Sequence, residues 1–398
     1  MRVLLSYNPK IAQYRFSESH PLRPERFSLA VELMAHWGLL DVPGSKDERQ
    51  GAAQIVEPPA ANEEDILLVH TPEYVSFVQA ASREPRRLAG HGIGPGDTPA
   101  FAGMHDAAAL AVGATSFAVD AVLGHRAHCA FSPAGGLHHA HRDHASGFCI
   151  YNDCAIAIER ATRSHPGLRV AYVDVDAHHG DGVEAAFYRR PDVLTLSVHE
   201  SGRYLFPGTG QATDIGEGAG RGAAINVPLP PDAGPECFDL VVAEVIEPAL
   251  AAFAPDLILV QAGGDSHRGD PLTHLYQSVE GYCRVLQALL ASAETLTEGR
   301  IVATGGGGYQ PFSAVPRMWA SAMALLLGAD VPRDLPAEWI DASREAAIAA
   351  HERPSEVTHT FEEEMPELDN ERNDVALQAT EHAVRLVQES APLLGAHR

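Results

Sequence analysis

The chain has 398 residues, of which 45% are hydrophobic, and its 53 acidic and 29 basic residues give a formal net charge of −24. This apolar content is typical of a globular protein with a large core. The acidic balance argues against binding to nucleic acid or to anionic membrane surfaces, whereas a cationic group would be attracted.

Short apolar runs alternate with longer segments of helical periodicity. We expect strands at Val3–Tyr7, Ile66–Val69, His128–Phe131, Arg169–Asp174, Val193–Val198, Ala224–Val227, Leu257–Gln261 and Ile301–Thr304. We expect helices at Phe27–Leu40, Glu73–Ala81, Met104–Leu123, Asn152–Ser164, Gly182–Arg189, Cys237–Phe253, Val279–Ser292 and Val315–Leu327. This alternation predicts a single α/β domain with a central parallel sheet of about eight strands and helices on both faces.

The connections at 83–103 and 200–222 are rich in glycine or proline and are expected to be ordered, functional surface loops. Residues 352–372 are acidic and punctuated by proline, so we expect irregular structure there, followed by an amphipathic helix at Asn373–Gln388. We therefore predict one main domain in residues 1–330 and a helical appendage, 331–398, packed on it.

Cysteine usage and the N-terminus bear on the cellular location. The five cysteines are odd in number and form no CxxC pair, which argues against a disulfide framework. The opening MRVLLSYNPK has the pattern of a first strand and not of a signal peptide. A reducing, cytoplasmic compartment is the expected location.

The most informative segment is DVDAHHGDG, which spans 174–182 and ends a buried strand. The carboxyl end of such a strand is where open α/β sheets bind ligands. Asp176 and His178 are two residues apart, so in an extended segment they point the same way and could bind one metal ion. The alternative interpretation is a solvated, charged turn.

Other segments place reactive groups after predicted strands. GGLHHAHRDH at 135–144 contains two adjacent histidines, which fit either a site or a surface metal scavenger. QAGGDSHRGDPL at 261–272 offers Asp265, His267 and Asp270, and the four glycines of ATGGGGYQP deliver Tyr309. No serine or cysteine lies in a nucleophile elbow, so these groups indicate metal-assisted attack by water.

In this order, the paired histidines, DxDxHHGDG, GxDxHxGDP and GGGGY resemble the arginase/deacetylase superfamily, in its histone-deacetylase branch. The resemblance runs from about residue 7 to 330. HPLRPER at 20–26, VPRMW at 315–319 and LPAEW at 335–339 are similar to the bacterial acetoin-utilisation deacetylases. Gly180 stands where binuclear ureohydrolases carry a second carboxylate, which favours one catalytic metal.

The resemblance implies a role for each motif residue. Asp176, His178 and Asp270 match the metal ligands. His138 and His139 match tandem histidines that are hydrogen-bonded to Asp174 and Asp181, with His139 as the base that activates a metal-bound water. Tyr309 matches a tyrosine that polarises the acetyl carbonyl together with the metal. The remaining matches are the substrate-binding residues Asp97, Gly147, Phe148 and Phe206, Arg26 near an acetate channel, and a monovalent cation site of Asp174, Asp176, His178, Ser197 and Val198.

The implied activity is removal of acetyl from the ε-amine of acetyl-lysine in a protein or peptide by a metal-dependent amidohydrolase. The implied cofactors are Zn²⁺ and a structural K⁺, although two carboxylates and one imidazole are also compatible with Fe²⁺. An acyl-CoA synthetase is the implied client. The alternatives are an acetylpolyamine deacetylase and a catalytically inactive acetyl-lysine binder. No oligomeric state is assigned.

Overall fold

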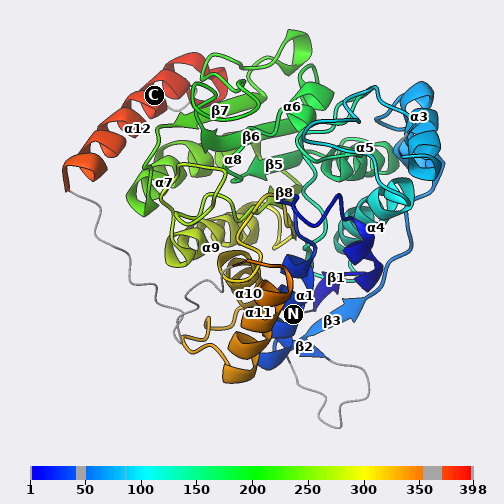
Figure 1. The fold of residues 1–398 in the computed structure, drawn as a ribbon. Coiled ribbons are helices and arrows are strands. Elements are labelled where there is room, and N and C mark those ends of the chain that lie inside the picture. The colour runs from blue at the N-terminus through cyan, green and yellow to red at the C-terminus, as the bar shows by residue number, and fades with distance from the viewer. Residues whose placement is uncertain (1, 42–50, 86, 353–369, 396–398) are drawn as a thin grey trace.

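A sheet of nine strands runs through the centre of the protein (Figure 1), in a computed structural model that describes residues 2–41, 51–85, 87–352 and 370–395. The strand order is β2-β3-β1-β4-β9-β8-β5-β6-β7, and every neighbouring pair is parallel. This confirms the predicted α/β architecture. The strands are β1 (Val3–Ser6), β2 (Leu40–Asp41), β3 (Ala53–Val56), β4 (Cys129–Ser132), β5 (Val170–Asp174), β6 (Val193–Glu200), β7 (Ala224–Leu229), β8 (Leu257–Gln261) and β9 (Ile301–Thr304).

The central strands are apolar throughout because both faces of the sheet are covered. Successive side chains of a strand point to opposite faces. In β5, Ala171 and Val173 belong to one buried cluster, whereas Val170 and Tyr172 belong to another on the opposite face. The two clusters explain why this strand reads as a continuous hydrophobic run and not as an alternating one.

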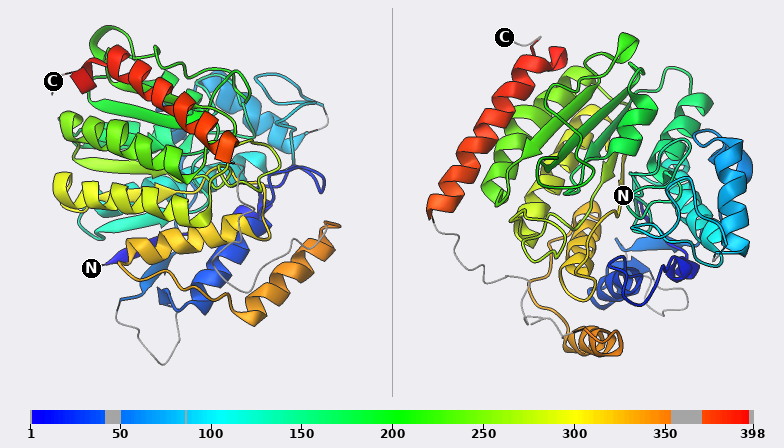
Figure 2. Two further views of the ribbon diagram at one scale, coloured as in Figure 1. Left: turned by 90° about the vertical axis from the view of Figure 1, so that its left-hand side faces the viewer. Right: turned by 45° about the horizontal axis from the view of Figure 1, so that its top comes forward.

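Helices form a layer on each side of the sheet. Figure 2 shows α12, α7, α9 and α10 along one face, with α4 and α5 on the other. The helices are α1 (Glu25–His36), α2 (Glu63–Ile66), α3 (Pro72–Arg83), α4 (Met104–Leu123), α5 (Asp153–Ser164), α6 (Asp181–Phe187), α7 (Pro235–Val241), α8 (Glu247–Phe253), α9 (Val279–Leu296), α10 (Ala314–Leu326), α11 (Ala337–Ala349), α12 (Asn370–Ser390) and α13 (Pro392–Gly395). A π-helical turn, Val242–Ile246, joins α7 to α8, so the helix predicted at Cys237–Phe253 is continuous.

One predicted strand is wrong. Ile66 ends the short helix α2, and residues 67–69 form a turn. The side chain of Asn62 accepts the backbone N–H of Asp65 at 2.8 Å, which caps this helix, and a four-residue apolar run alone does not distinguish helix from strand. The sequence analysis also missed β2 and β3, which are short and lie at one edge of the sheet.

The C-terminal helices pack against the body of the protein. In α11, Trp339 is fully buried and donates its indole N–H to the carbonyl of Leu29 in α1 at 2.9 Å. The α12 helix, predicted at Asn373–Gln388, packs against β7. Most of the predicted irregular segment, 352–372, lies outside the described residues.

Helix α4 is long and apolar enough to cross a membrane by length and composition alone. However, 67% of its apolar window is buried inside the protein. It packs against α5 and β4, so it has the surroundings of a core helix.

Replacing Trp339 tests whether α11 folds together with the rest of the chain. We expect Trp339→Ala to lower the free energy of unfolding by about 3–5 kcal/mol, because it leaves a large cavity and an unpaired carbonyl on Leu29. Guanidinium denaturation followed by circular dichroism measures this change. Ile348→Ala, on the same helix at a side chain that is 60% exposed, is the control and should change stability little. An unchanged main transition in Trp339→Ala would contradict joint folding.

Candidate metal centre and active site

The candidate site lies at the carboxyl ends of five neighbouring strands, β4, β9, β8, β5 and β6. His138 and His139 follow β4, Asp176 and His178 follow β5, and Tyr309 follows β9. Because all of these strands are parallel, their carboxyl ends meet at one edge of the sheet, which brings distant motifs together.

Three side chains at this edge are close enough to share one metal ion. One ligand atom from each of Asp176, His178 and Asp265 lies within 4.8 Å of the others, and all three residues are buried. Burial, followed by the nearby charge of Asp176, raises the pKa of Asp265 to about 7. A divalent cation would relieve the repulsion between these two carboxylates. The donor set of two carboxylates and one imidazole suits Zn²⁺ and is compatible with Fe²⁺.

Asp265 completes this geometric group, whereas the resemblance implies Asp270, whose role as a metal ligand stays a prediction. Asp270 instead accepts the backbone N–H of Leu272 through Oδ1 at 2.9 Å and that of Tyr309 through Oδ2 at 2.7 Å. Its carboxylate therefore fixes the chain that carries Tyr309. The segment after β8 contains both aspartates, and burial together with the charge of Asp265 raises the pKa of Asp270 to about 8, so a cation would relieve both carboxylates.

Two further groups hold the carboxylate of Asp176. Its Oδ2 accepts the side-chain N–H of Gln261 and the backbone N–H of Gly307, each at 2.7 Å. Gln261 was not among the site residues predicted from the sequence. The available signal was its polar side chain at the end of an otherwise apolar strand, LILVQ.

Each of the paired histidines has its own aspartate. His138 Nδ1 lies 2.7 Å from Asp174 Oδ2, and His139 Nδ1 lies 2.7 Å from Asp181 Oδ1. The two Nε2 atoms are 3.1 Å apart. A carboxylate on Nδ1 fixes the tautomer of each ring and directs Nε2 toward the site.

The two histidines differ in basicity. Burial opposes a charge on His138, but Asp174 and Asp176 outweigh it and raise its pKa to about 9. Burial and the neighbouring His138 lower the pKa of His139 to about 3. A proton on this pair therefore resides on His138, which leaves His139 neutral and able to accept a proton.

The loop that carries these histidines is fixed from α5. Asp153 accepts the backbone N–H of Gly136 at 3.0 Å and of Leu137 at 2.7 Å. The side chain of Asn152 donates to the carbonyls of His138 and Ala140 at 3.2 and 3.0 Å. These two residues, which end the segment ASGFCIYND at 145–153, therefore hold the paired histidines in place.

Aromatic side chains stand next to the reactive groups. The Phe148 ring lies 5.7 Å from that of Tyr309, and the Phe206 ring lies 5.0 Å from that of His139. Gly147 has a φ of +50°, and a Cβ there would overlap the His139 ring, so the position requires glycine. Its N–H donates to Asp97 Oδ2 at 3.1 Å. The four predicted substrate-binding residues therefore lie around the site, and their contact with substrate stays a prediction.

Arg26 lies behind Tyr309 in the interior. It is buried, donates to the carbonyl of Gly308 at 3.0 Å and stacks its guanidinium 5.1 Å from the Trp319 ring centroid. Burial lowers its pKa, although Tyr309 and nearby carboxylates oppose the shift. The role of Arg26 beside an acetate channel stays a prediction.

The predicted monovalent cation site is placed by strand register. Asp174 in β5 pairs with Ser197 in β6, and Val198 is the next residue of the same buried strand. Asp176 and His178 follow directly after β5. The five residues are therefore adjacent, and potassium binding by them stays a prediction.

Comparison with known proteins gives a consistent result. Residues 20–326 match the family model of the histone deacetylase domain. The chain is 41% identical over 337 residues to the acetoin utilization protein AcuC of Bacillus subtilis (strain 168), and 36% identical over 343 residues to AcuC of Staphylococcus aureus (strain MRSA252). Each alignment covers 84% of this chain and 84% of the relative.

Two solved structures are also similar to this chain in fold. A histone deacetylase (HDAC) homolog from Aquifex aeolicus matches with a TM-score of 0.81 at 31% identity, over 96% of this chain and 100% of that one. An HDAC homolog complexed with SAHA matches with a TM-score of 0.79 at 30% identity, over 96% and 99% of the two chains.

Fold and site together define a hydrolase of the deacetylase class, built on a parallel α/β sheet and with a candidate metal centre. The chain belongs to the histone deacetylase family. The predicted resemblance, including the similarity to acetoin-utilisation proteins, is confirmed.

Metal analysis distinguishes Asp265 from Asp270. We expect Asp265→Ala to weaken binding of a divalent metal ion by more than about 100-fold, because it removes a direct ligand. Asp270→Asn is the comparison: loss of metal in this variant would support the ligand role that the resemblance implies, and retained metal would show that Asp270 acts through the backbone N–H groups that it accepts. Equilibrium dialysis followed by elemental analysis measures both. Retained metal in Asp265→Ala would refute the place of Asp265 in the ligand group.

Proposed function

We propose that this protein removes acetyl groups from the ε-amine of lysine in proteins or peptides by metal-dependent hydrolysis. The observation that carries the proposal is the convergence of one carboxylate–imidazole ligand group, two His–Asp pairs and Tyr309 at a single sheet edge. This set supplies a Lewis acid site, a base and a hydrogen-bond donor for amide hydrolysis.

Each residue of the site has its own role in the proposed hydrolysis. Asp176 and His178 would hold the metal ion together with Asp270, as the resemblance implies, or with Asp265, and the ion supplies polarisation of the acetyl carbonyl when bound. Neutral His139 takes a proton from the attacking water and gives it to the leaving amine. His138 stabilises developing negative charge through its own positive charge. The Tyr309 hydroxyl donates a hydrogen bond to the carbonyl oxygen as it becomes negative, and burial raises its pKa well above 10, so it stays protonated.

The side chains of Phe148 and Phe206 would flank the aliphatic stem of the acyl-lysine, and Asp97, at Gly147, would bind the substrate backbone. Arg26, behind Tyr309, would assist the departure of acetate. Asp174, Asp176, His178, Ser197 and Val198 would hold a potassium ion through their oxygen atoms. The chemistry of the donor sets supports these assignments.

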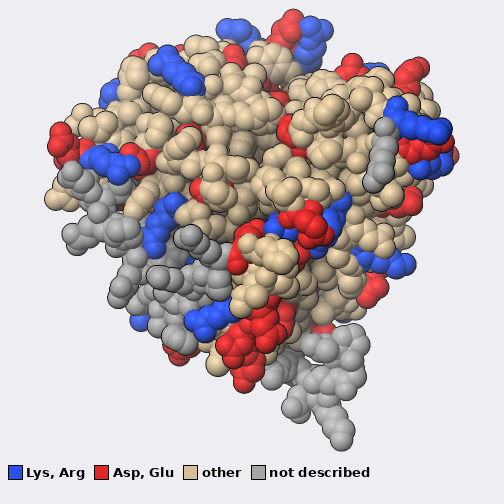
Figure 3. Space-filling view, viewed as in Figure 1, with Lys and Arg blue, Asp and Glu red and all other residues tan. Residues whose placement is uncertain are grey.

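The partner we propose is an acetylated protein, and an acyl-CoA synthetase is the client that fits the acetoin-utilisation relatives. On the face drawn in Figure 3, Lys and Arg side chains lie in separate groups among acidic and uncharged ones. That distribution and the net charge of −24 favour a basic substrate surface over nucleic acid. We propose a cytoplasmic location, consistent with five buried, unpaired cysteines.

Replacing His139 tests the mechanism. We expect His139→Ala to lower kcat by at least about 100-fold on an acetyl-lysine peptide, because the general base is lost. Tyr309→Phe should also lower kcat, while its metal content stays unchanged. Near-normal turnover in His139→Ala would exclude the assigned role, and an inactive wild type that binds the peptide would instead indicate an acetyl-lysine binder.

A paired substrate assay tests the substrate class. We expect hydrolysis of an acetyl-lysine peptide to exceed that of acetylpolyamines in kcat/KM, and a chelator to abolish both activities, because they share one metal centre. Metal analysis of anaerobically purified protein distinguishes Zn²⁺ from Fe²⁺. Faster hydrolysis of acetylpolyamines would favour the alternative function.

A further inference from the structure

The carboxylate of Asp181 is shared between two histidines. Its Oδ1 accepts Nδ1–H of His139 at 2.7 Å and the backbone N–H of Gly182 at 3.0 Å. Its Oδ2 lies 3.1 Å from Nε2 of a third histidine, His141. The catalytic pair is therefore extended by one imidazole that none of the roles above uses.

The other His–Asp pair lacks such an extension. Asp174 receives His138 at 2.7 Å and the hydroxyl of Tyr172 at 2.6 Å, and burial raises the pKa of that hydroxyl well above 10. Its second donor is thus a neutral group at every relevant pH. The corresponding donor to Asp181 is an imidazole, which gains a positive charge on protonation. The two pairs consequently respond differently to pH.

The loop holds His141 in place. Its backbone N–H donates to the carbonyl of His144 at 2.9 Å, and the two imidazole rings stack with centroids 4.6 Å apart and planes 9° apart. His144 is in turn fixed by Asp143 through a 2.7 Å hydrogen bond. The same loop is anchored at Ala140 by Asn152. The contact of His141 with Asp181 is therefore built into the fold.

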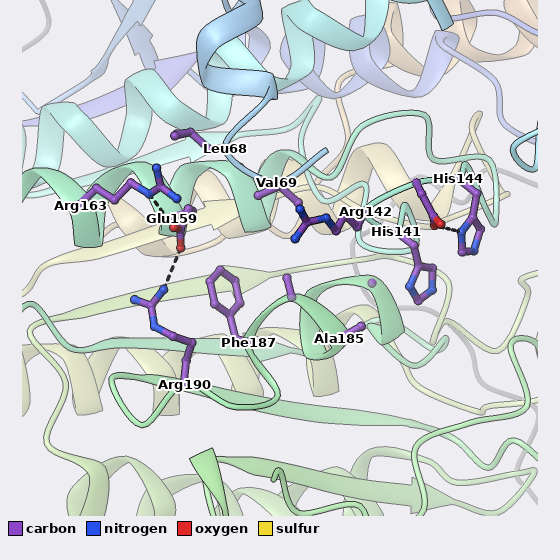
Figure 4. A pocket seen from close by; sticks show the side chains of 13 residues that line it. Leu68, Val69, His141, Arg142, His144, Glu159, Arg163, Ala185, Phe187 and Arg190 are labelled. Atoms are coloured by element: carbon purple, nitrogen blue, oxygen red, sulfur yellow. Dashed lines mark hydrogen bonds and ion pairs between the residues drawn. The ribbon is translucent and has the colours of Figure 1, made fainter. Parts of the chain in front are cut away.

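His141 also connects Asp181 with solvent. Its side chain is 25% exposed, compared with 13% for Asp181 and 6% for His139. It lines two cavities, of about 380 and 650 Å³, that lie beside α6. Figure 4 shows His141 and His144 side by side at one end of the smaller cavity, while Arg142 extends from the same loop toward Val69. His141 can therefore exchange a proton with water, whereas His139 is shielded.

We propose that His141 is a positioning residue that, through Asp181, sets the orientation and the basicity of His139. A donor on each oxygen fixes the plane of the Asp181 carboxylate, so that Oδ1 faces His139. When His141 is protonated, its charge compensates that of Asp181, and His139 becomes a weaker base. The inference rests on the proposed role of His139 as the general base.

The charges around His141 determine the pH at which it acts. The hydrogen bond to Asp181 raises the pKa of His141 above its ordinary value of 6.5, and burial opposes this shift. Protonation of His141 is therefore favoured relative to that of a free histidine. The titratable and charged groups that face it or share its two cavities are His70, Arg142, Asp143, His144, Glu159, Arg163, His179, Asp181, Glu184, Tyr188, Arg189 and Arg190.

The test compares kcat and KM as functions of pH in the full-length wild type, His141→Phe and His141→Gln, with an acetyl-lysine peptide as substrate. The control is His36→Gln on α1, a remote histidine beside Glu32. We expect His141→Phe to lower kcat by about tenfold without a change in KM, as for other residues that orient a reacting group. The acid limb of the kcat–pH profile of this variant should move to higher pH by about half a unit. The reason is that loss of the nearby positive charge raises the pKa of His139.

His141→Gln keeps an N–H donor but cannot be charged. We expect this variant to recover most of the plateau kcat, while the acid limb of its pH profile stays shifted. His36→Gln should match the wild type in plateau kcat and in the position of the acid limb. An equal fall of kcat at every pH with an unmoved acid limb, or no recovery in His141→Gln, would overturn the proposal.

A second measurement needs no turnover. NMR titration of protein labelled with ¹³C in histidine assigns His141 by the signal missing from His141→Gln. Its pKa should exceed 6.5 in the wild type and fall in Asp181→Asn. An ordinary pKa in both proteins would overturn the inference, whereas inactivity of the wild type would overturn only the proposed function.

Discussion

Burial of several carboxylates at one edge of the sheet is the constraint on which the rest of the site depends. An ionised carboxylate in an apolar interior is so costly that it must be hydrogen-bonded, paired or neutralised. Asp174 and Asp181 meet this requirement with imidazoles, and Asp176 meets it with Gln261, Gly307 and His178. Burial and neighbouring carboxylates instead raise the pKa values of Asp265 and Asp270 to about 7 and about 8. The uncompensated negative charge thus lies around these two carboxylates, where a cation is the natural compensation.

The same constraint explains the glycines around the site. Asp176 takes a hydrogen bond from the backbone N–H of Gly307, which requires the chain after β9 to pass directly over the carboxylates. A Cβ at Gly307 would overlap the carboxylate of Asp265. The run of four glycines therefore serves the hydrogen bonding of buried charge as well as the delivery of Tyr309.

The sequence was sufficient to predict the elements and site residues that lie in clear apolar runs or in recognisable motifs. Apolar runs located seven of the nine strands, and the resemblance implied the two His–Asp hydrogen bonds that the structure contains, His138 with Asp174 and His139 with Asp181. The sequence does not decide between two candidates that share a segment. Asp265 and Asp270 both follow β8, and the direction of each side chain is set by backbone turns that no local pattern specifies. The strand predicted at Ile66–Val69 is wrong because Asn62 caps a short helix there, and the apolar run alone does not distinguish the two structures.

The pairing of β5 with both neighbours has a consequence for how this protein can change over evolutionary time. Asp174 is aligned with Ser197 on one side and with Gln261 on the other. A single residue inserted into β5 would turn every later side chain to the opposite face and would carry Asp174 and Asp176 out of the site. Homologous chains are therefore expected to differ in length within the loops at 83–103 and 200–222 and to keep the lengths of their central strands.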